Sequence, residues 1–330
     1  MTLDFRAIGI AVGHATDSAG ATGLTIVRGI DAPLRAGAAV FGRATGTREL
    51  HTLTADHLVD RIDALMLTGG SAYGLDAAAG AMRWMEERGR GFPVRGGIVP
   101  IIPAAVVFDL APLGRFDARP TAQMAYDACE RASPNEIEEG SVGAGTGATV
   151  GKVAGPERAM KGGFGGAAMT NGSWSVGALA VVNALGDVRD ASGRIIAGAR
   201  ADASGGAPFL DTARQLAAAD TAAAPATSRL DPPVPTNTTL CVVATTAPLG
   251  RVELGQLARA AGAALFRRIT PTGTSVDGDV VFALAPAVPP ESLGRAQMAV
   301  EALAVEALER AIERAVVTAR GRDGIPGLAD

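Results

Sequence analysis

The amino-acid sequence predicts a layered α+β fold. Strand-like and helix-like segments follow one another in mixed order, without the steady strand–helix alternation of a doubly wound sheet. Apolar residues make up 48% of the chain and aromatic residues only 4%, so the core must consist mainly of Ala, Val, Leu and Ile, and 43 glycines allow many tight turns. The 330 residues are within reach of one large unit, and we expect residues 1–330 to form a single domain.

The N-terminal part of the chain mixes strands and short helices. Residues 9–27 are predicted to form two strands joined by a polar turn over 14–20. Apolar side chains at helical spacing predict a short helix over Asp56–Asp63. The remaining predicted elements are the strand Ala64–Leu67, the helix Leu75–Arg88, the strand region Pro100–Phe108 and the helix Thr121–Arg131.

The C-terminal part combines buried strands with amphipathic helices. Gly177–Asn183 is an apolar run that ends on a polar residue, and Thr238–Thr245 is rich in β-branched residues, so both are predicted strands. Apolar side chains recur at helical spacing over Arg251–Arg267. The expected apolar side of that helix carries Val252, Leu254, Leu257 and Leu265. The last predicted elements are the strand Val280–Leu284 and the helix Arg295–Arg320.

The segment before Thr238 differs in character from the rest of the chain. Residues 201–237 are rich in Ala, Asp, Thr and Pro, and the sequence Pro-Pro-Val-Pro at 232–235 cannot hold a regular strand ladder. We therefore predict a linker over 201–237 that is mobile at least in part.

The composition argues against several classes of function. The formal net charge is −4, which gives no basic face for nucleic acid. Two cysteines and three histidines without a cluster do not predict a zinc site, and no cofactor is expected. Residues 1–10 lack the apolar core of a signal peptide, and no run of about 18 apolar residues is free of charges or breakers. We therefore expect a soluble cytoplasmic protein that does not enter the membrane.

The junction Asn237–Thr238 joins the proline-rich segment to a predicted strand. An N-terminal nucleophile hydrolase needs this arrangement, because its nucleophile begins a strand and the preceding segment becomes dispensable. The Thr238 hydroxyl could attack the Asn237 carbonyl and turn the amide into an ester, which water hydrolyses. The new α-amine, with a pKa of about 7.7–8.0, could then activate its own hydroxyl. By itself, Asn-Thr-Thr before a strand is also typical of an ordinary turn.

Seven stretches, which occur in the family's order, resemble the L-aminopeptidase/D-esterase family of self-processing peptidases. That family includes β-aminopeptidases and the nylon-oligomer (6-aminohexanoate-oligomer) endo-hydrolase. Together they span about residues 9–284 and are far more specific than any one of them. The stretches are Val12–Asp17, Leu67–Asp76, Gly140–Gly147 with Gly151–Lys152, Lys161–Gly165, Val181–Asn183, Asn237–Thr239 with Val242–Thr245, and Asp277–Asp279.

The resemblance implies a four-layer αββα sandwich of the N-terminal nucleophile hydrolase type. It implies processing into a large chain, 1–237, and a small chain, 238–330, and assembly of the processed units into homo-oligomers, for which a tetramer is expected. It also implies that Thr238 is the nucleophile and that Asp277 and Asp279 orient and polarise it. The residues implied to line the site are Lys152, Asn183 and Tyr73.

The chain departs from the aminopeptidase branch of the family in its nucleophile and its acidic pair. By this resemblance, the aminopeptidase branch has a Ser nucleophile and a Ser-x-Glu pair. This chain has Thr238 and Asp277-Gly-Asp279 at the matching positions. The combination is similar to the nylon-oligomer branch. It favours hydrolysis of ω-amino-acid oligomers or related amides over a strict aminopeptidase activity.

The residue types suit these roles, although each also has an ordinary structural interpretation. Asp-Gly is a common turn, but two carboxylates two residues apart at the start of a strand would point the same way. Lys152 could be a surface charge, or it could lower the pKa of the Thr238 amine. The Asn183 amide could end a strand or donate to an oxyanion, and the Tyr73 hydroxyl could pack or donate. His14 and Cys241 are expected to be structural.

The predicted function is a self-cleaving amide hydrolase acting on small linear substrates such as ω-amino-acid oligomers or short peptides. Three alternatives remain open at this point. The chain could be an aminopeptidase/D-esterase or β-aminopeptidase, or an acyltransferase that resembles the ornithine acetyltransferases and passes the acyl group to an amine. It could also be an uncleaved, non-catalytic assembly protein.

Overall fold

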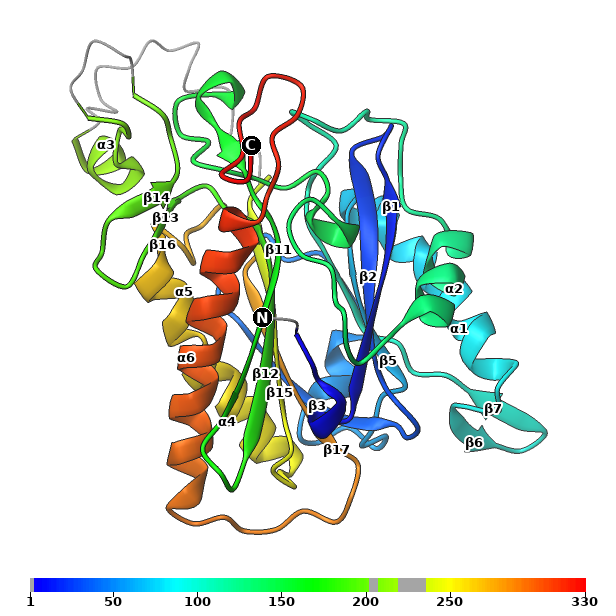
Figure 1. Cartoon of the computed structure of the whole chain (residues 1–330). Helices are drawn as coiled ribbons and strands as arrows, with labels where there is room; N and C mark the ends of the chain where they lie inside the picture. The colour runs from blue at the N-terminus through cyan, green and yellow to red at the C-terminus, as the bar shows by residue number, and fades with distance from the viewer. Residues whose placement is uncertain (1–2, 202–206, 219–235) are drawn as a thin grey trace.

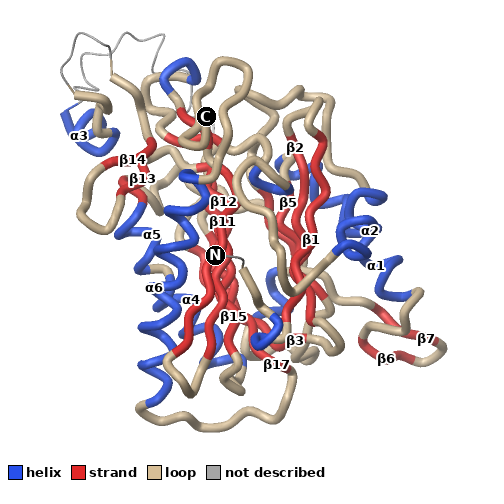
Figure 2. Tube along the Cα trace, viewed as in Figure 1, coloured by secondary structure: helices blue, strands red, loops and turns tan. Residues whose placement is uncertain are grey.

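Two five-stranded sheets face each other, and helices cover both outer faces (Figure 1). The computed structural model describes residues 3–201, 207–218 and 236–330. The layers follow one another as helices, sheet, sheet and helices, also visible in the tube view (Figure 2). This is the predicted α+β, four-layer αββα arrangement.

The first sheet has the strand order β1-β2-β5-β8-β4. Only β5 and β8 pair in parallel within it. Helices α1 and α2 cover its outer face (Figure 1). The bounds are β1 Ile10–Asp17, β2 Thr22–Gly29, β4 Thr47–Arg48, β5 Ala64–Thr68, β8 Ala104–Val106, α1 Ala78–Glu86 and α2 Ala122–Arg131.

The second sheet has the order β11-β12-β15-β17-β3. Its pairs are antiparallel except β15 with β17. Helices α4, α5 and α6 cover its outer face (Figure 1). The bounds are β3 Leu34–Val40, β11 Gly163–Thr170, β12 Ser175–Asn183, β15 Thr238–Thr245, β17 Val280–Pro286, α4 Arg251–Ala261, α5 Ala263–Arg268 and α6 Ala296–Val317.

The remaining elements are short strands and helices outside the two five-stranded sheets. The short strands are β6 Phe92–Val94, β7 Gly97–Val99, β9 Thr149–Val150, β10 Met160–Lys161, β13 Asp187–Arg189, β14 Ile195–Ala197 and β16 Ile269–Thr270. Short helices are η1 Arg6–Ile8, η2 Leu50–Leu53, η3 Ser71–Ala77, η4 Gly143–Gly145, η5 Pro156–Arg158 and α3 Thr212–Ala218. No helix of the described residues is long and apolar enough to cross a membrane.

Three apolar cores separate the four layers. One lies between α1, α2 and the first sheet, one between the sheets, and one between the second sheet and α4 to α6. Strand β15 contributes to two of them, because side chains alternate along a strand. Leu240 and Val242 face the first sheet, whereas Cys241 and Val243 face the helices. The placement of Cys241 in the core is therefore confirmed.

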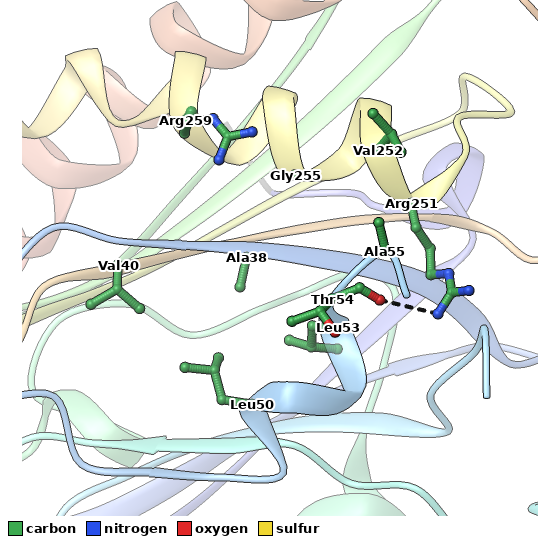
Figure 3. A pocket seen from close by; sticks show the side chains of 10 residues that line it. All are labelled: Ala38, Val40, Leu50, Leu53, Thr54, Ala55, Arg251, Val252, Gly255 and Arg259. Atoms are coloured by element: carbon green, nitrogen blue, oxygen red, sulfur yellow. Dashed lines mark hydrogen bonds between the residues drawn. The ribbon is translucent and has the colours of Figure 1, made fainter. Parts of the chain in front are cut away.

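The predicted helix over Asp56–Asp63 is wrong. Leu58 is 89% exposed, so the apolar spacing of this segment does not mark a buried face. Backbone carbonyls of the segment accept hydrogen bonds from the Arg251 guanidinium and not from the N–H groups of a helix. The guanidinium donates to His57 O and, at 3.4 Å, to Val59 O within the segment, and to Thr54 O just before it at 3.1 Å; Figure 3 shows the contact with Thr54. A side chain from almost two hundred residues along the chain thus replaces local hydrogen bonds.

Other boundaries shift for local reasons. Strand β1 continues to Asp17, so most of the predicted polar turn over 14–20 is strand. The strand predicted over Pro100–Phe108 is limited to β8. Val252, expected on the apolar side of its helix, is 66% exposed. That helix is divided between α4 and α5 at Gly262, where a Cβ would lie 2.1 Å from the Phe41 ring.

Part of the predicted linker over 201–237 is ordered against the body of the protein. Helix α3 begins at Thr212, which is buried. Its backbone N–H donates to the Asp187 carboxylate at 2.6 Å and its hydroxyl donates to the same carboxylate at 2.8 Å. The linker interpretation for 202–206 and 219–235 falls outside the described residues.

Candidate active site

Three neighbouring strands bring most of the predicted site residues to one end of the second sheet. Strand β12 runs antiparallel to β15, so its last residue, Asn183, is the Cα partner of Thr238, the first residue of β15. Strands β15 and β17 are parallel and therefore begin at the same end, where Asn237 forms a bridge with Asp277. The topology thus collects residues that are far apart in the sequence.

Strand alternation points Thr238 and Asn183 into the space between the sheets. Thr238 points to the same face as Leu240, two residues along β15, and Asn183 points to the same face as Val181 in β12. Both of these apolar residues lie in the core between the sheets. Thr238 is 5% exposed and Asn183 is 1% exposed. Two polar side chains therefore sit side by side at the edge of an apolar core.

The carbonyl oxygen of Asn237 is held from two sides. The Thr238 hydroxyl donates to it at 2.6 Å, and the backbone N–H of Gly278 donates to it at 2.9 Å. A Cβ at position 278 would lie 2.7 Å from Thr238 Oγ1 and 2.8 Å from Ala44 O. Glycine at 278 thus allows the backbone just before β17 to approach both the hydroxyl and the carbonyl that it would attack.

Lys152 and Asn183 form a second hydrogen-bonded group on the β12 side. Lys152 Nζ donates to Asn183 O at 3.1 Å, to Asn183 Oδ1 at 3.0 Å and to Thr236 O at 3.1 Å. Asn183 Nδ2 donates to Phe108 O and to Thr236 O, each at 3.1 Å. Gly151, with φ of 70°, turns the chain so that Lys152 reaches this group.

Burial lowers the pKa of Lys152 from 10.5 to about 7, and the charges of Asp277 and Asp279 oppose this shift in part. Burial dominates because desolvation disfavours the ammonium form. A lysine with this pKa exchanges its proton near neutral pH, which is the property expected of a group that takes part in proton transfer.

The two aspartates accept hydrogen bonds from groups near Thr238 and in the loop before β17. Asp279 accepts from the backbone N–H of Thr239 at 2.6 Å, and its other oxygen accepts from Thr272 Oγ1 at 2.6 Å. Asp277 accepts from the backbone N–H and hydroxyl of Thr274 at 2.9 and 2.6 Å. Both carboxylates thus contact the same loop, as expected of residues two apart at the start of a strand.

Burial raises the pKa of Asp279, and the neighbouring charge of Asp277 adds to the effect. Neither carboxylate is hydrogen-bonded to the Thr238 hydroxyl in the uncut chain, where that hydroxyl donates to Asn237 O. The direct polarisation of the nucleophile by this pair therefore stays a prediction.

Tyr73 lies outside the hydrogen-bonded groups around Thr238. It is 52% exposed, its ring lies 3.5 Å from the Arg119 guanidinium carbon, and it meets Phe116 edge-on. No hydrogen bond of the described residues joins its hydroxyl to Thr238, Lys152 or Asn183. Its role in the site stays a prediction.

A cavity of about 220 Å³ opens beside Lys152. Lys152 is the single charged side chain among its described lining residues, which are Phe108, Ala111, Pro112, Lys152, Pro156 and Thr236. A second cavity, of about 400 Å³, lies between α4 and η2 and is lined by Arg251 and Arg259 among apolar side chains (Figure 3). It includes none of the predicted site residues.

The surroundings of His14 agree with the structural role expected for it. His14 Nδ1 lies 2.9 Å from Thr25 Oγ1, its ring packs edge-on against Phe164, and burial lowers its pKa to about 4, in keeping with a structural role. The Gly278 amide and the Thr236 carbonyl were not predicted from the sequence. Backbone groups carry no sequence signature of their own. The one available signal was the glycine at 278, between the two aspartates predicted to belong to the site.

Comparisons with known proteins agree with this architecture. The model of peptidase family S58 matches residues 7–329. An uncharacterized aminopeptidase of Mycobacterium tuberculosis is 41% identical, covering 98% of this chain and 95% of its own. A 6-aminohexanoate-oligomer endohydrolase of a Kocuria species is 32% identical, covering 93% of this chain and 83% of its own.

Among solved structures, the L-aminopeptidase D-Ala-esterase/amidase from Ochrobactrum anthropi superimposes with a TM-score of 0.68 at 21% identity. The match covers 98% of this chain and 90% of that one. Its description calls it a new variant among the N-terminal nucleophile hydrolase fold, and at this identity the likeness shows the fold alone.

Proposed function

The chain belongs to peptidase family S58 and is an amide-bond hydrolase of the N-terminal nucleophile type, and from that premise we propose that it cuts itself between Asn237 and Thr238. The observation that carries the proposal is the contact of 2.6 Å between the Thr238 hydroxyl and the Asn237 carbonyl oxygen. The attacking group and the bond to be cut are already adjacent in the uncut chain.

The cut proceeds in two steps. The Thr238 oxygen bonds to the Asn237 carbonyl carbon, the C–N bond breaks, and the hydroxyl proton passes to the departing amine, so that an ester replaces the amide. Water then hydrolyses the ester, which leaves a carboxylate on Asn237 and a free amine on Thr238. The products would be a large chain, 1–237, and a small chain, 238–330.

The processed chain would carry its nucleophile and base on one residue. The new α-amine, with a pKa of about 7.7–8.0 in the absence of neighbours, takes the proton of the Thr238 hydroxyl during attack on a substrate amide. The ammonium of Lys152 disfavours protonation of that amine. Asn183 donates to the oxyanion, Asp279 fixes the backbone beside the nucleophile, and water deacylates the enzyme.

The cavity beside Lys152 favours an uncharged chain as the substrate. No carboxylate is among its described lining residues, so nothing in this wall would bind a free substrate ammonium. We therefore prefer ω-amino-acid oligomers and similar linear amides. The second candidate is an aminopeptidase, because the mycobacterial relative bears that name. Assembly into homo-oligomers and a cytoplasmic location stay predictions, and sedimentation velocity would test the former.

Mass spectrometry of the purified protein tests the cut. We expect two fragments, the smaller beginning at Thr238, and a single uncut chain in the Thr238→Ala variant. Thr239→Val is a matched control, because Thr239 Oγ1 is buried without a hydrogen-bond partner among the described residues and its loss should leave the cut intact. A folded wild-type chain that stays uncut would refute the proposal. A panel of α-, β- and ω-amino amides, with and without an amine acceptor, then identifies the reaction.

A further inference from the structure

Two consecutive carbonyl groups before Thr238 are held by different donors. Thr236 O accepts from Lys152 Nζ and Asn183 Nδ2, each at 3.1 Å. Asn237 O accepts from Gly278 N at 2.9 Å. Successive carbonyls of an extended chain point to opposite sides, so one is directed toward β12 and the other toward β17. The carbonyl that is cut therefore lies away from Asn183.

Asn183 has no donor left for another oxygen in the uncut chain. An asparagine side chain has two N–H groups and one carbonyl oxygen with two lone pairs. Both N–H groups are used, on Phe108 O and Thr236 O. The carbonyl oxygen accepts from Thr149 N at 3.1 Å and from Lys152 Nζ at 3.0 Å. The side chain is thus fully bonded without any contact with the Asn237 carbonyl.

We propose that the cut and the turnover use separate oxyanion donors, and that the Thr236 carbonyl occupies the turnover site until the cut releases it. The inference rests on the proposed self-cleavage. The Gly278 N–H would stabilise the oxyanion that forms on Asn237 O when Thr238 attacks. The Asn183 amide, with Lys152 beside it, would stabilise the oxyanion formed on a substrate carbonyl.

The position of Thr236 supports its role as a temporary occupant. Its carbonyl oxygen sits between the two donors as the oxygen of a substrate amide would. Thr236 also lines the cavity beside Lys152, so its departure would enlarge that cavity at the point where the donors are exposed. The uncut chain therefore contains an internal amide in the place assigned to the substrate, and it should not bind or turn over added amides.

The first test separates the rate of the cut from the rate of turnover in Asn183 variants. Asn183→Asp removes both N–H groups but keeps oxygens facing Thr149 N and Lys152 Nζ. We expect its cut to proceed within about threefold of wild type, whereas turnover per cut chain should fall by about 10²–10³. Asn183→Ala should behave alike and guards against an effect of the added charge.

The second test addresses the Gly278 donor. Gly278→Ala places a Cβ 2.7 Å from Thr238 Oγ1 and 2.8 Å from Ala44 O, so the backbone must shift and carry the Gly278 N–H away from Asn237 O. The cut should slow by about 10² or more, the lower end of what a lost donor costs. Gly255→Ala is the matched control, because a Cβ there meets nothing within 4 Å, and its cut should be unchanged. Near-ultraviolet circular dichroism establishes that each variant is folded.

The outcomes distinguish the inference from the function on which it rests. If wild-type protein never cuts, the proposed function fails. If wild type cuts but both folded Asn183 variants lose cutting as strongly as turnover, a single donor serves both reactions and the inference is overturned. A folded Gly278→Ala chain that cuts at the wild-type rate would also overturn it.

Discussion

Two lysines lie close together in the sequence and both have a lowered pKa, yet their surroundings differ. Burial lowers the pKa of both Lys152 and Lys161 from 10.5 to about 7. Lys161 is 1% exposed, and within the described residues it donates to backbone carbonyls, Thr146 O at 2.9 Å and Ala148 O at 2.7 Å among them. Lys152 contacts the Asn183 side chain and lines a cavity.

A shifted pKa therefore does not by itself identify a catalytic group. Lys161 stabilises the glycine-rich loop before β9, because its ammonium donates to backbone carbonyls of that loop. Lys152 stands where a substrate could reach it. Geometry, and not the titration, therefore distinguishes Lys152, which we propose acts in the site, from Lys161.

The largest expected effect is on turnover. Lys152→Met should reduce kcat/KM of the cut protein by about 10²–10³, because it removes a charged neighbour of the nucleophile and of the oxyanion. Lys161→Met should leave kcat/KM per folded chain within about threefold of wild type. Steady-state kinetics on a linear amide, with the amount of cut chain determined by mass spectrometry, measures both. Equal losses in the two variants would remove the distinction between the lysines.

The next effect is on stability and runs in the opposite order. Lys161→Met leaves buried carbonyls without a donor and should lower the free energy of unfolding by about 1–3 kcal/mol. Lys152→Met should cost less, because water in the adjoining cavity can replace the ammonium. Urea unfolding in the uncut Thr238→Ala background compares the two without interference from cleavage. A larger loss for Lys152→Met would reverse our assignment of roles.

The pH dependence of stability offers a finer test. Between pH 7 and 10.5 the unfolded chain keeps the lysine proton, whereas folded Lys161 loses it near pH 7. The unfolded state therefore binds more protons, and stability must rise with pH across this window. Lys161→Met should flatten the rise. An unchanged slope in urea unfolding between pH 7 and 10 would show that Lys161 stays charged when buried.

The smallest expected effect concerns Asp109, which lies near Lys161. Its carboxylate accepts from Gly70 N and Thr22 Oγ1, each at 2.7 Å, and burial raises its pKa from 3.8 to about 6. The folded chain thus binds more protons between pH 4 and 6, and stability should fall as pH rises through this range. Asp109→Asn should remove the fall. Thermal unfolding at pH 4, 5 and 6 measures it, and a persistent fall would point to other carboxylates.

The fold was predictable from the sequence where local pattern and tertiary packing agree. Strand β15 begins and ends at the predicted residues, because its β-branched run is buried on both faces. Helix α2 begins at the predicted place because Thr121 caps it, accepting from Met124 N at 3.3 Å. The helix predicted over Asp56–Asp63 does not form, since Arg251 binds the His57 and Val59 carbonyls and no local pattern reports such a contact.

The candidate site was predictable in its side chains but not in its backbone. Thr238, Lys152 and Asn183 stand out as polar residues in apolar or glycine-rich stretches, and the structure brings them together. The Gly278 N–H and the Thr236 carbonyl belong to groups that every residue carries, so only the pairing of β15 with its neighbours reveals them. Tyr73 matched a motif, yet sequence similarity does not show where an exposed ring points.

The strand order of the second sheet has a consequence for the processed protein. Strands β15 and β17 would belong to the small chain, and they lie between β12 and β3 of the large chain. The two fragments would then contribute strands to the same sheet. They could separate only if the hydrogen bonds between its central strands broke. Dissociation and denaturation would be the same event. The unfolding midpoint of the cut protein should rise with protein concentration, and refolding from separated chains should follow second-order kinetics, whereas the uncut chain should show neither.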